Sequence, residues 1–220
     1  MGTVSMEEYF GDWYPIINTT ILNAILERLL KESNYCPTPD KVFQAFVECK
    51  FKDLKVVFIG MDPYPQKGVA TGLAFANAKE TKPSNYSPSL KVLIDAVNKY
   101  YDDLPLGGFD CTLKLWCKQG VLLLNSALTV KENEVGSHML LWRPFIISLI
   151  QNIAKVKPDT IFVFFGTQAK SLHKYISNSP AVKVVHPAFC VRNKSFLPNF
   201  FKEIDDIMIT KGSNNLIYWL

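Results

Sequence analysis

The chain has 220 residues, of which 48% are hydrophobic and 20% are charged; this composition excludes a disordered chain and fits one domain spanning residues 1–220. The 24 Lys and Arg residues against 20 Asp and Glu give a formal charge of +4, which permits a nucleic-acid partner without requiring one. No apolar run approaches the roughly 20 residues that cross a bilayer, so we expect no membrane span and no membrane partner.

Apolar periodicity predicts helices alternating with short strands along the chain. The strand segments are nearly continuous apolar runs, which is typical of strands that are covered on both faces. In chain order, the pattern predicts a helix at 21–30, a strand at 55–59, a helix at 89–101, a strand at 120–124, a helix at 142–156 with Pro144 in its first turn, a strand at 160–165, a helix at 168–176, a strand at 182–185 and a helix at 197–209. This order predicts an α/β fold, a three-layer α/β/α sandwich around a central four-stranded, mostly parallel sheet.

The five cysteines indicate the compartment and exclude some cofactors. They are odd in number, widely spaced and never arranged as C-x-x-C, which argues against a zinc site or an iron–sulfur cluster. Free thiols are typical of a reducing environment, and residues 1–13 contain no apolar segment of the kind found in signal peptides. We therefore expect an intracellular, cytoplasmic protein without a signal or transmembrane segment.

Polar residues follow each of the four predicted strands. Ligands of open parallel sheets bind beyond the carboxyl ends of the strands, so these residues are expected to meet at one edge. The segments at the strand ends are Gly60-Met61-Asp62-Pro63-Tyr64-Pro65, Asn125-Ser126, Gly166-Thr167 and His186-Pro187.

The residue types at this edge suit a planar base on a sugar. Asn125 presents a donor and an acceptor side by side, which matches a pyrimidine edge, and Phe75 offers a face for stacking. Tyr64 is bulky enough to close one side of a pocket. Asp62 can position water or stabilise a cationic sugar, and His186 can hydrogen-bond an oxygen on a departing base as negative charge develops there.

The ordered set of motifs resembles the family 1 uracil-DNA glycosylases. By this resemblance the chain would be a divergent member of viral or bacterial type. The likeness extends from about residue 55 to residue 201 and rests on four blocks in the family's order. These blocks are Gly60–Pro65, Gly72–Phe75, Gly120–Val130 and His186-Pro187.

The resemblance implies a role for each matching residue. Asp62 would be the catalytic carboxylate that orients water, and His186 the neutral imidazole that stabilises the departing uracil anion. Four residues would bind the base, with Asn125 reading its edge, Phe75 stacking on it and Tyr64 excluding the methyl group of thymine. These uracil-binding residues are Met61, Tyr64, Phe75 and Asn125. The family hydrolyses the N-glycosidic bond without a metal or other cofactor.

The same resemblance implies contacts to uracil-containing DNA, single- or double-stranded, from which the target nucleotide must be flipped out. One loop would press on the DNA backbone, a Gly-Thr turn would offer amides to phosphate, and the segment after His186 would enter the minor groove. The residues concerned are Ser87, Pro88 and Ser89 in the loop, Gly166 and Thr167 in the turn, and Ala188 and Phe189 after His186.

The sequence departs from the family pattern in three places, and these departures affect the expected contacts to DNA more than the expected catalytic residues. Met61 replaces a glutamine, Pro65 replaces a histidine, and Ala188-Phe189-Cys190 replaces Ser-Pro-Leu. No leucine wedge is present, so Phe189 is the candidate substitute.

Two functions stay open at this point. The first is a monofunctional uracil-DNA glycosylase of base-excision repair. The alternative is a DNA-binding accessory protein of replication or of a polymerase, in which glycosylase activity is secondary or lost, as the resemblance to poxvirus relatives suggests. We expect a monomer, with a DNA-mimicking protein inhibitor or a replication partner as further candidates for binding. A glycosylase for thymine-derived bases is disfavoured by Tyr64.

Overall fold

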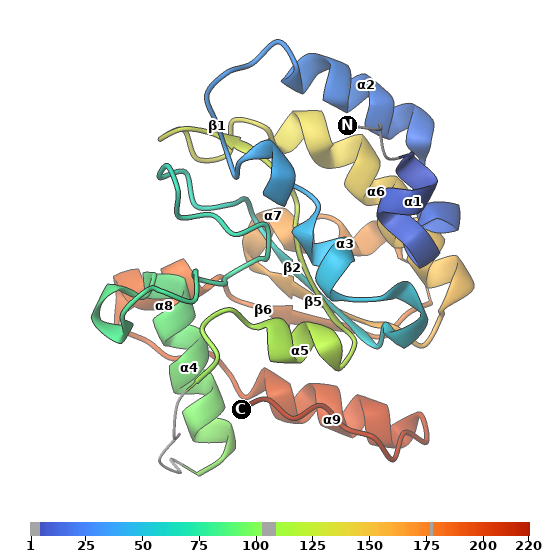
Figure 1. The fold of residues 1–220 in the computed structure, drawn as a ribbon. Coiled ribbons are helices and arrows are strands. Elements are labelled where there is room, and N and C mark those ends of the chain that lie inside the picture. Colours follow the sequence, from blue (N-terminus) through green and yellow to red (C-terminus); the bar gives the residue numbers. More distant parts are fainter. Residues whose placement is uncertain (1–4, 103–108, 177) are drawn as a thin grey trace.

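The computed structural model describes residues 5–102, 109–176 and 178–220, and at its centre is a parallel sheet in the order β3-β2-β5-β6 (Figure 1). The strands are β2 (Val56–Gly60), β3 (Val121–Asn125), β5 (Ile161–Phe165) and β6 (Ala181–Val184). Every residue of β2, β3 and β5 is buried, whereas the edge strand β6 leaves Lys183 exposed. The predicted α/β class is confirmed, and the four-stranded sheet is parallel throughout rather than mostly parallel.

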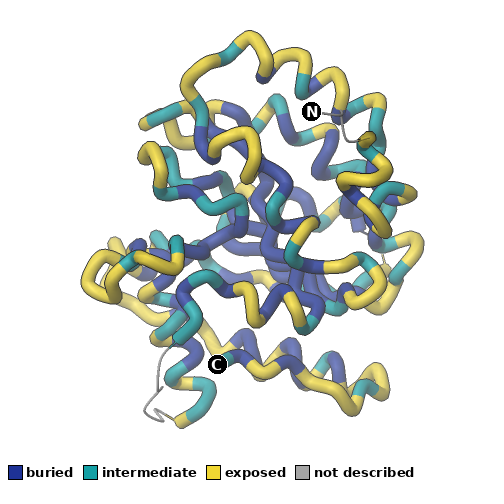
Figure 2. The backbone as a smooth tube through the Cα atoms, viewed as in Figure 1, coloured by how far each residue is buried: buried dark blue, intermediate teal, exposed yellow. Residues whose placement is uncertain are grey.

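Helices cover the sheet on both sides, which buries the apolar faces of its strands. Figure 1 places α2 and α6 on one side of the sheet, and α5 and α9 on the other. The tube in Figure 2 is accordingly buried along the sheet and exposed along the outer helices. The helices of these layers are α2 (Thr19–Leu29), α4 (Pro88–Tyr100), α5 (Lys114–Lys118), α6 (Met139–Val156), α8 (Pro187–Asn193) and α9 (Phe200–Thr210).

The other elements of the described chain are shorter. Two residues each from β1 (Tyr35–Cys36) and β4 (Val130–Lys131) form a second, antiparallel sheet. The remaining elements are α1 (Met6–Phe10), η1 (Gly11–Ile16), η2 (Pro39–Lys41), α3 (Gln44–Glu48), η3 (Phe51–Asp53), η4 (Pro83–Asn85), α7 (Gly166–Lys170) and η5 (His173–Tyr175). Within residues 5–102, 109–176 and 178–220, no helix is long and apolar enough to cross a membrane. All five cysteines are free and buried.

Three helices differ from their predicted extents. Helix α6 begins at Met139, so Pro144 lies beyond the first turn and leaves the carbonyl of the exposed Leu140 without its helical partner. The helix predicted at 168–176 is instead the short α7 followed by the 3₁₀ turn η5. Helix α9 begins only after Asn199, whose side chain accepts from the Lys202 amide at 3.2 Å and caps the helix.

The segment after α9 fills the core beside the sheet. Trp219 is fully buried; its ring stacks on Phe58 of β2 at 5.8 Å between centroids and lies 4.7 Å from that of Phe201. The Trp116 indole N–H of α5 donates to the Trp219 carbonyl at 3.0 Å. This segment therefore belongs to the core and closes the layer formed by α5 and α9.

We expect Trp219→Ala to lower the free energy of unfolding by about 3–5 kcal/mol, because it leaves a large cavity against Phe58. Urea denaturation followed by circular dichroism measures this change. The matched control is Tyr218→Ala, whose side chain is 59% exposed and whose removal should change stability by less than about 0.5 kcal/mol. Equal losses in the two variants would contradict a core role for Trp219.

Candidate active site

The register of the parallel sheet brings the polar strand ends to one level. Gly60 pairs with Asn125, Ile59 with Phe164, and Phe165 with Val184, so the four strands end side by side. The loop after β3 is bonded to the loop after β2, since the Ser126 hydroxyl donates to the Gly60 carbonyl at 2.7 Å. The predicted convergence of the four strand ends is confirmed.

One pocket is formed where these ends meet. Its lining contains all six residues predicted to be catalytic or base-binding, and also Ser89 from the loop predicted to touch DNA. The six are Met61, Asp62, Tyr64, Phe75, Asn125 and His186.

Gly60 is the position that lets the side chains of Asn125 and Phe75 approach the sheet. A Cβ atom there would lie 2.5 Å from Asn125 Oδ1 and 3.2 Å from the Phe75 ring. Any larger residue would displace both side chains, so the glycine that precedes Met61 is required by the packing of the pocket itself.

Asp62 is held by the backbone of a distant loop. Its Oδ2 accepts a hydrogen bond from the Gly136 amide at 2.5 Å. Burial raises the pKa of Asp62, and the hydrogen bond from Gly136 offsets part of that rise by stabilising the carboxylate. The side chain is thus a fixed carboxylate, more basic than a free aspartate and placed to accept a proton from water.

Gly136 is a residue of the candidate site that the sequence did not indicate. It adopts φ +81°, a left-handed conformation that favours glycine. The following residues anchor its loop. The Lys131 amide donates to Ser137 Oγ at 2.8 Å, and His138 contacts Thr129 Oγ1 and Glu32 Oε2, each at 2.8 Å. The sequence offers only a glycine in a polar stretch, with nothing that relates it to Asp62.

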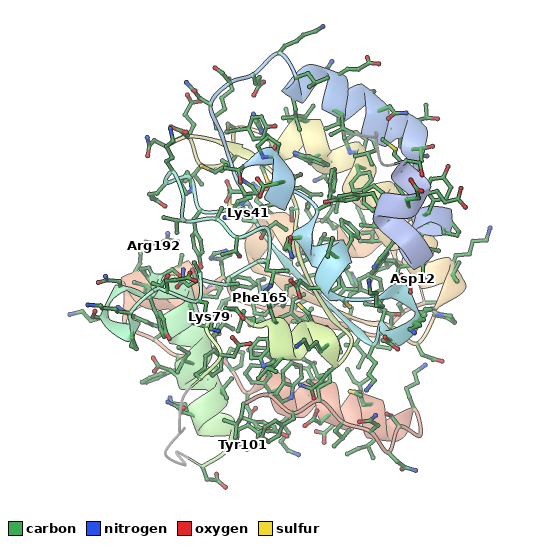
Figure 3. All side chains as sticks on the ribbon, in the orientation of Figure 1. Asp12, Lys41, Lys79, Tyr101, Phe165 and Arg192 are labelled. Carbon is green, nitrogen blue, oxygen red and sulfur yellow. The ribbon has the colours of Figure 1, made fainter. Side chains whose placement is uncertain are left out.

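The hydrogen bonding of His186 fixes its tautomer. Its Nδ1 accepts from the Ala188 amide at 3.1 Å, so in the neutral ring the proton resides on Nε2. Burial lowers the pKa of His186, and the positive charge of Arg192 lowers it further. His186 is therefore a neutral imidazole with a donor available at Nε2. Figure 3 labels Arg192 towards the margin of the molecule and Phe165, the last residue of β5, near its middle.

Tyr64 and Phe75 form adjoining walls of the pocket. The Tyr64 hydroxyl donates to the Phe75 carbonyl at 3.0 Å and lies 2.5 Å from Ser87 Oγ. Burial raises the pKa of Tyr64 to about 12, so the phenol stays neutral. The Phe75 ring packs edge-on to Phe165 with centroids 4.9 Å apart, and its centroid lies 6.2 Å from that of His186. Both aromatic side chains are fixed before any ligand arrives.

The residues predicted to touch DNA are placed in two different ways. Pro88, Thr167 and Phe189 are exposed, and Phe189 is 45% exposed on α8, two residues after the start of that helix. Gly166 and Ala188 are partly buried beside His186. Ser87 and Ser89 are buried, and Ser87 lies behind Tyr64 rather than on the surface.

This arrangement defines a class of site: a pocket for a planar ligand, with a basic carboxylate, a neutral imidazole donor and an amide at its walls. No group of three or more His, Cys, Asp or Glu residues that could hold a metal ion occurs in the described ranges. The chain belongs to the uracil DNA glycosylase superfamily, whose family model matches residues 46–207.

Curated proteins and solved structures agree with this family. The uracil-DNA glycosylase of Fusobacterium nucleatum is 33% identical over 223 residues, covering 96% of each chain. That of Gallid herpesvirus 2 is 33% identical over 203 residues, covering 90% of this chain and 63% of its own. The crystal structure of mimivirus uracil-DNA glycosylase superposes with a TM-score of 0.72 at 20% identity, over 99% of this chain and 94% of its own. The last likeness concerns the fold alone.

We expect Asp62→Asn to stabilise the protein at neutral pH. Because burial raises the pKa of Asp62, its charge costs stability above the folded-state pKa, and this cost disappears as the pH falls towards the unfolded value of about 3.9. The amide removes the charge and keeps an oxygen for the Gly136 amide. Thermal melts should thus give the variant a higher Tm at pH 7.5 and a narrowing gap towards pH 4.

The matched control for this experiment is Asp159→Asn. Asp159 is exposed at the opposite edge of the sheet and pairs with Lys211 at 2.6 Å. This variant should show no gain in Tm at pH 7.5. A wild-type protein more stable than Asp62→Asn at that pH would contradict the argument from burial.

Proposed function

We propose that the protein hydrolyses the N-glycosidic bond of deoxyuridine in DNA, releasing uracil and leaving an abasic site. The observation that carries this proposal is the single pocket that joins Asp62 and the Nε2 donor of His186 to Asn125, Phe75 and Tyr64. Membership of the uracil DNA glycosylase superfamily supports the same reaction.

The chemistry follows from the placement of two residues. As the bond between C1′ and N1 breaks, its electron pair leaves with uracil and negative charge spreads onto the base oxygen O2. The His186 Nε2–H then donates to that oxygen. Asp62 stabilises the cationic sugar and takes a proton from the water whose oxygen bonds to C1′. A neutral imidazole and a basic carboxylate are the protonation states that these steps need.

Base selection follows from the walls. The Asn125 amide pairs its acceptor with the uracil N3–H and its donor with O4, while Phe75 stacks on the ring. Tyr64 closes the space next to C5 of the base, where thymine carries its methyl group. We also propose that Met61 contributes to uracil binding through its backbone. Its carbonyl accepts from the Ala127 amide at 3.0 Å, which holds the Met61 backbone at the pocket, and its thioether side chain offers no strong hydrogen-bonding group.

The surface around the pocket supports a base-flipping mode of binding. We propose that Phe189 fills the space left by the flipped nucleotide, since it is an exposed aromatic residue close in sequence to His186. Pro88 would meet the DNA backbone from the surface, whereas the buried Ser89 could reach only a nucleotide that enters the pocket it lines. Gly166 and Thr167 would offer amides to phosphate at the start of α7, where the first amides lack helical partners.

We further propose a monomer that acts in a reducing intracellular compartment, where its free cysteines persist. A DNA-mimicking protein inhibitor is a candidate partner. Two variants of mimivirus UNG, which share the fold of this chain, were crystallised in complex with UGI. We expect the reaction to need no metal or other cofactor.

Uracil release from an oligonucleotide with one deoxyuridine, assayed in EDTA, tests the function. We expect Asp62→Asn and His186→Leu each to lower the rate about 100- to 1,000-fold, because each removes a group that acts on the transition state. DNA binding, measured by fluorescence anisotropy, should persist in both variants. Asp159→Asn is the matched control and should keep the wild-type rate. DNA binding without any uracil release by the wild-type protein would refute the proposal.

We expect Asn125→Asp to weaken the discrimination between uracil and cytosine. A carboxylate accepts hydrogen bonds from the cytosine amino group, whereas the Asn125 amide presents a donor to that group. Release of cytosine from an otherwise identical oligonucleotide should rise above the wild-type level, and release of uracil should fall. An unchanged cytosine rate would argue against base reading by Asn125.

A further inference from the structure

A chain of hydrogen bonds runs from helix α4 through the pocket wall. The Leu90 amide lies 3.4 Å from Ser87 Oγ, which lies 2.5 Å from the Tyr64 hydroxyl, which in turn lies 3.0 Å from the Phe75 carbonyl. A phenol has one hydrogen, and the Phe75 carbonyl can only accept it. The Ser87 hydroxyl therefore donates to the phenol oxygen and accepts from Leu90, so each hydroxyl donates once and accepts once.

Ser87 is itself held rigidly. The residue is 9% exposed, and its amide donates to Asn77 Oδ1 at 2.8 Å. Asn77 is 3% exposed, and its own amide donates to the Cys111 carbonyl at 2.8 Å. Pro88 follows Ser87 as the first residue of α4 and restricts the backbone further. The hydroxyl that contacts Tyr64 thus has little freedom to move.

The far end of the chain is also constrained. Phe75 adopts φ +68°, a left-handed conformation that is unfavourable for a bulky residue and is kept only where its surroundings enforce it. The hydrogen bond from Tyr64 is one of those restraints, because it fixes the Phe75 carbonyl. Ser87 therefore reaches both aromatic walls of the pocket through a single phenol hydroxyl.

We propose that Ser87 is a positioning residue that sets the discrimination between uracil and thymine, by holding the Tyr64 ring in place through the Ser87–Tyr64–Phe75 hydrogen bonds. The inference rests on the proposed function, in which the methyl group of thymine collides with Tyr64. A wall excludes one methyl group only if it cannot yield by the size of that group. A pocket distinguishes one methyl group by roughly 10- to 200-fold when its walls stay in place.

The experiment compares thymine and uracil release from oligonucleotides that differ only in the target nucleotide. We expect Ser87→Ala to raise the ratio of thymine to uracil release about tenfold. Tyr64→Phe, which removes the hydroxyl and keeps the ring, should raise it similarly. In the Tyr64→Phe background, Ser87→Ala should have no further effect, because the two residues act through one hydrogen bond.

A control separates this effect from loss of helix capping, since Ser87 Oγ also caps α4. Asn18 caps α2 by accepting from the Ile21 amide at 3.1 Å and is not among the residues that line the pocket. Asn18→Ala removes a cap of the same kind and should leave the release ratio unchanged. If Ser87→Ala fails to fold, Tyr64→Phe alone still tests the hydrogen bond.

Binding of the free bases distinguishes failure of this inference from failure of the proposed function. Uracil and thymine are titrated into the wild-type protein and the variants by calorimetry. Absence of uracil release by the wild-type protein would refute the proposed function. The positioning role would still be supported if the ratio of uracil to thymine affinity were lower in Ser87→Ala than in the wild-type protein. An unchanged preference in both single variants, additive effects in the double variant, or binding of neither base would overturn the inference.

Discussion

The pairing of β2 with β3 is the constraint on which the site depends. Gly60 lies opposite Asn125, so the loop that carries Asp62 begins at the same level as Asn125. The loops then bind each other through two amides, from Ser126 to the Gly60 carbonyl and from Ala127 to the Met61 carbonyl. A shift of one residue in this register would move the Asp62 carboxylate relative to Asn125 by more than 3 Å along the strand.

Burial of the pocket sets the protonation states of both catalytic candidates. Removal from water disfavours charge, which raises the pKa of the Asp62 carboxyl and lowers the pKa of the His186 imidazole. The carboxylate becomes more basic and the imidazole stays neutral, so one physical cause prepares both residues. The same burial makes the charged Asp62 a cost to the folded state, which is typical of sites whose residues are kept for chemistry rather than stability.

Much of the fold and pocket could be predicted from sequence, because both depend on local patterns. Continuous apolar runs gave the four strands to within one residue at each end, and the rule for parallel sheets placed Asp62, Asn125 and His186 together. Three helix extents were wrong. Helix α6 begins at Met139 and contains Pro144 in its interior, whereas proline was expected only in the first turn. Apolar periodicity also does not indicate where the chain breaks after Lys170 or where the Asn199 cap starts α9. Gly136 could not be found because its contribution is a backbone amide, brought to Asp62 by tertiary contacts 74 residues apart in sequence.

Backbone groups hold most of the site, and this explains how the motif can vary without losing its geometry. The Gly136 amide fixes Asp62, the Ala188 amide fixes the tautomer of His186, and the Phe75 carbonyl receives Tyr64. Met61 contributes a carbonyl to the loop pairing, which does not depend on the identity of its side chain. Ser87 is different, because its side chain supplies the contact. Substitutions should therefore alter selectivity at positions such as Ser87 more readily than they disturb the placement of Asp62 and His186.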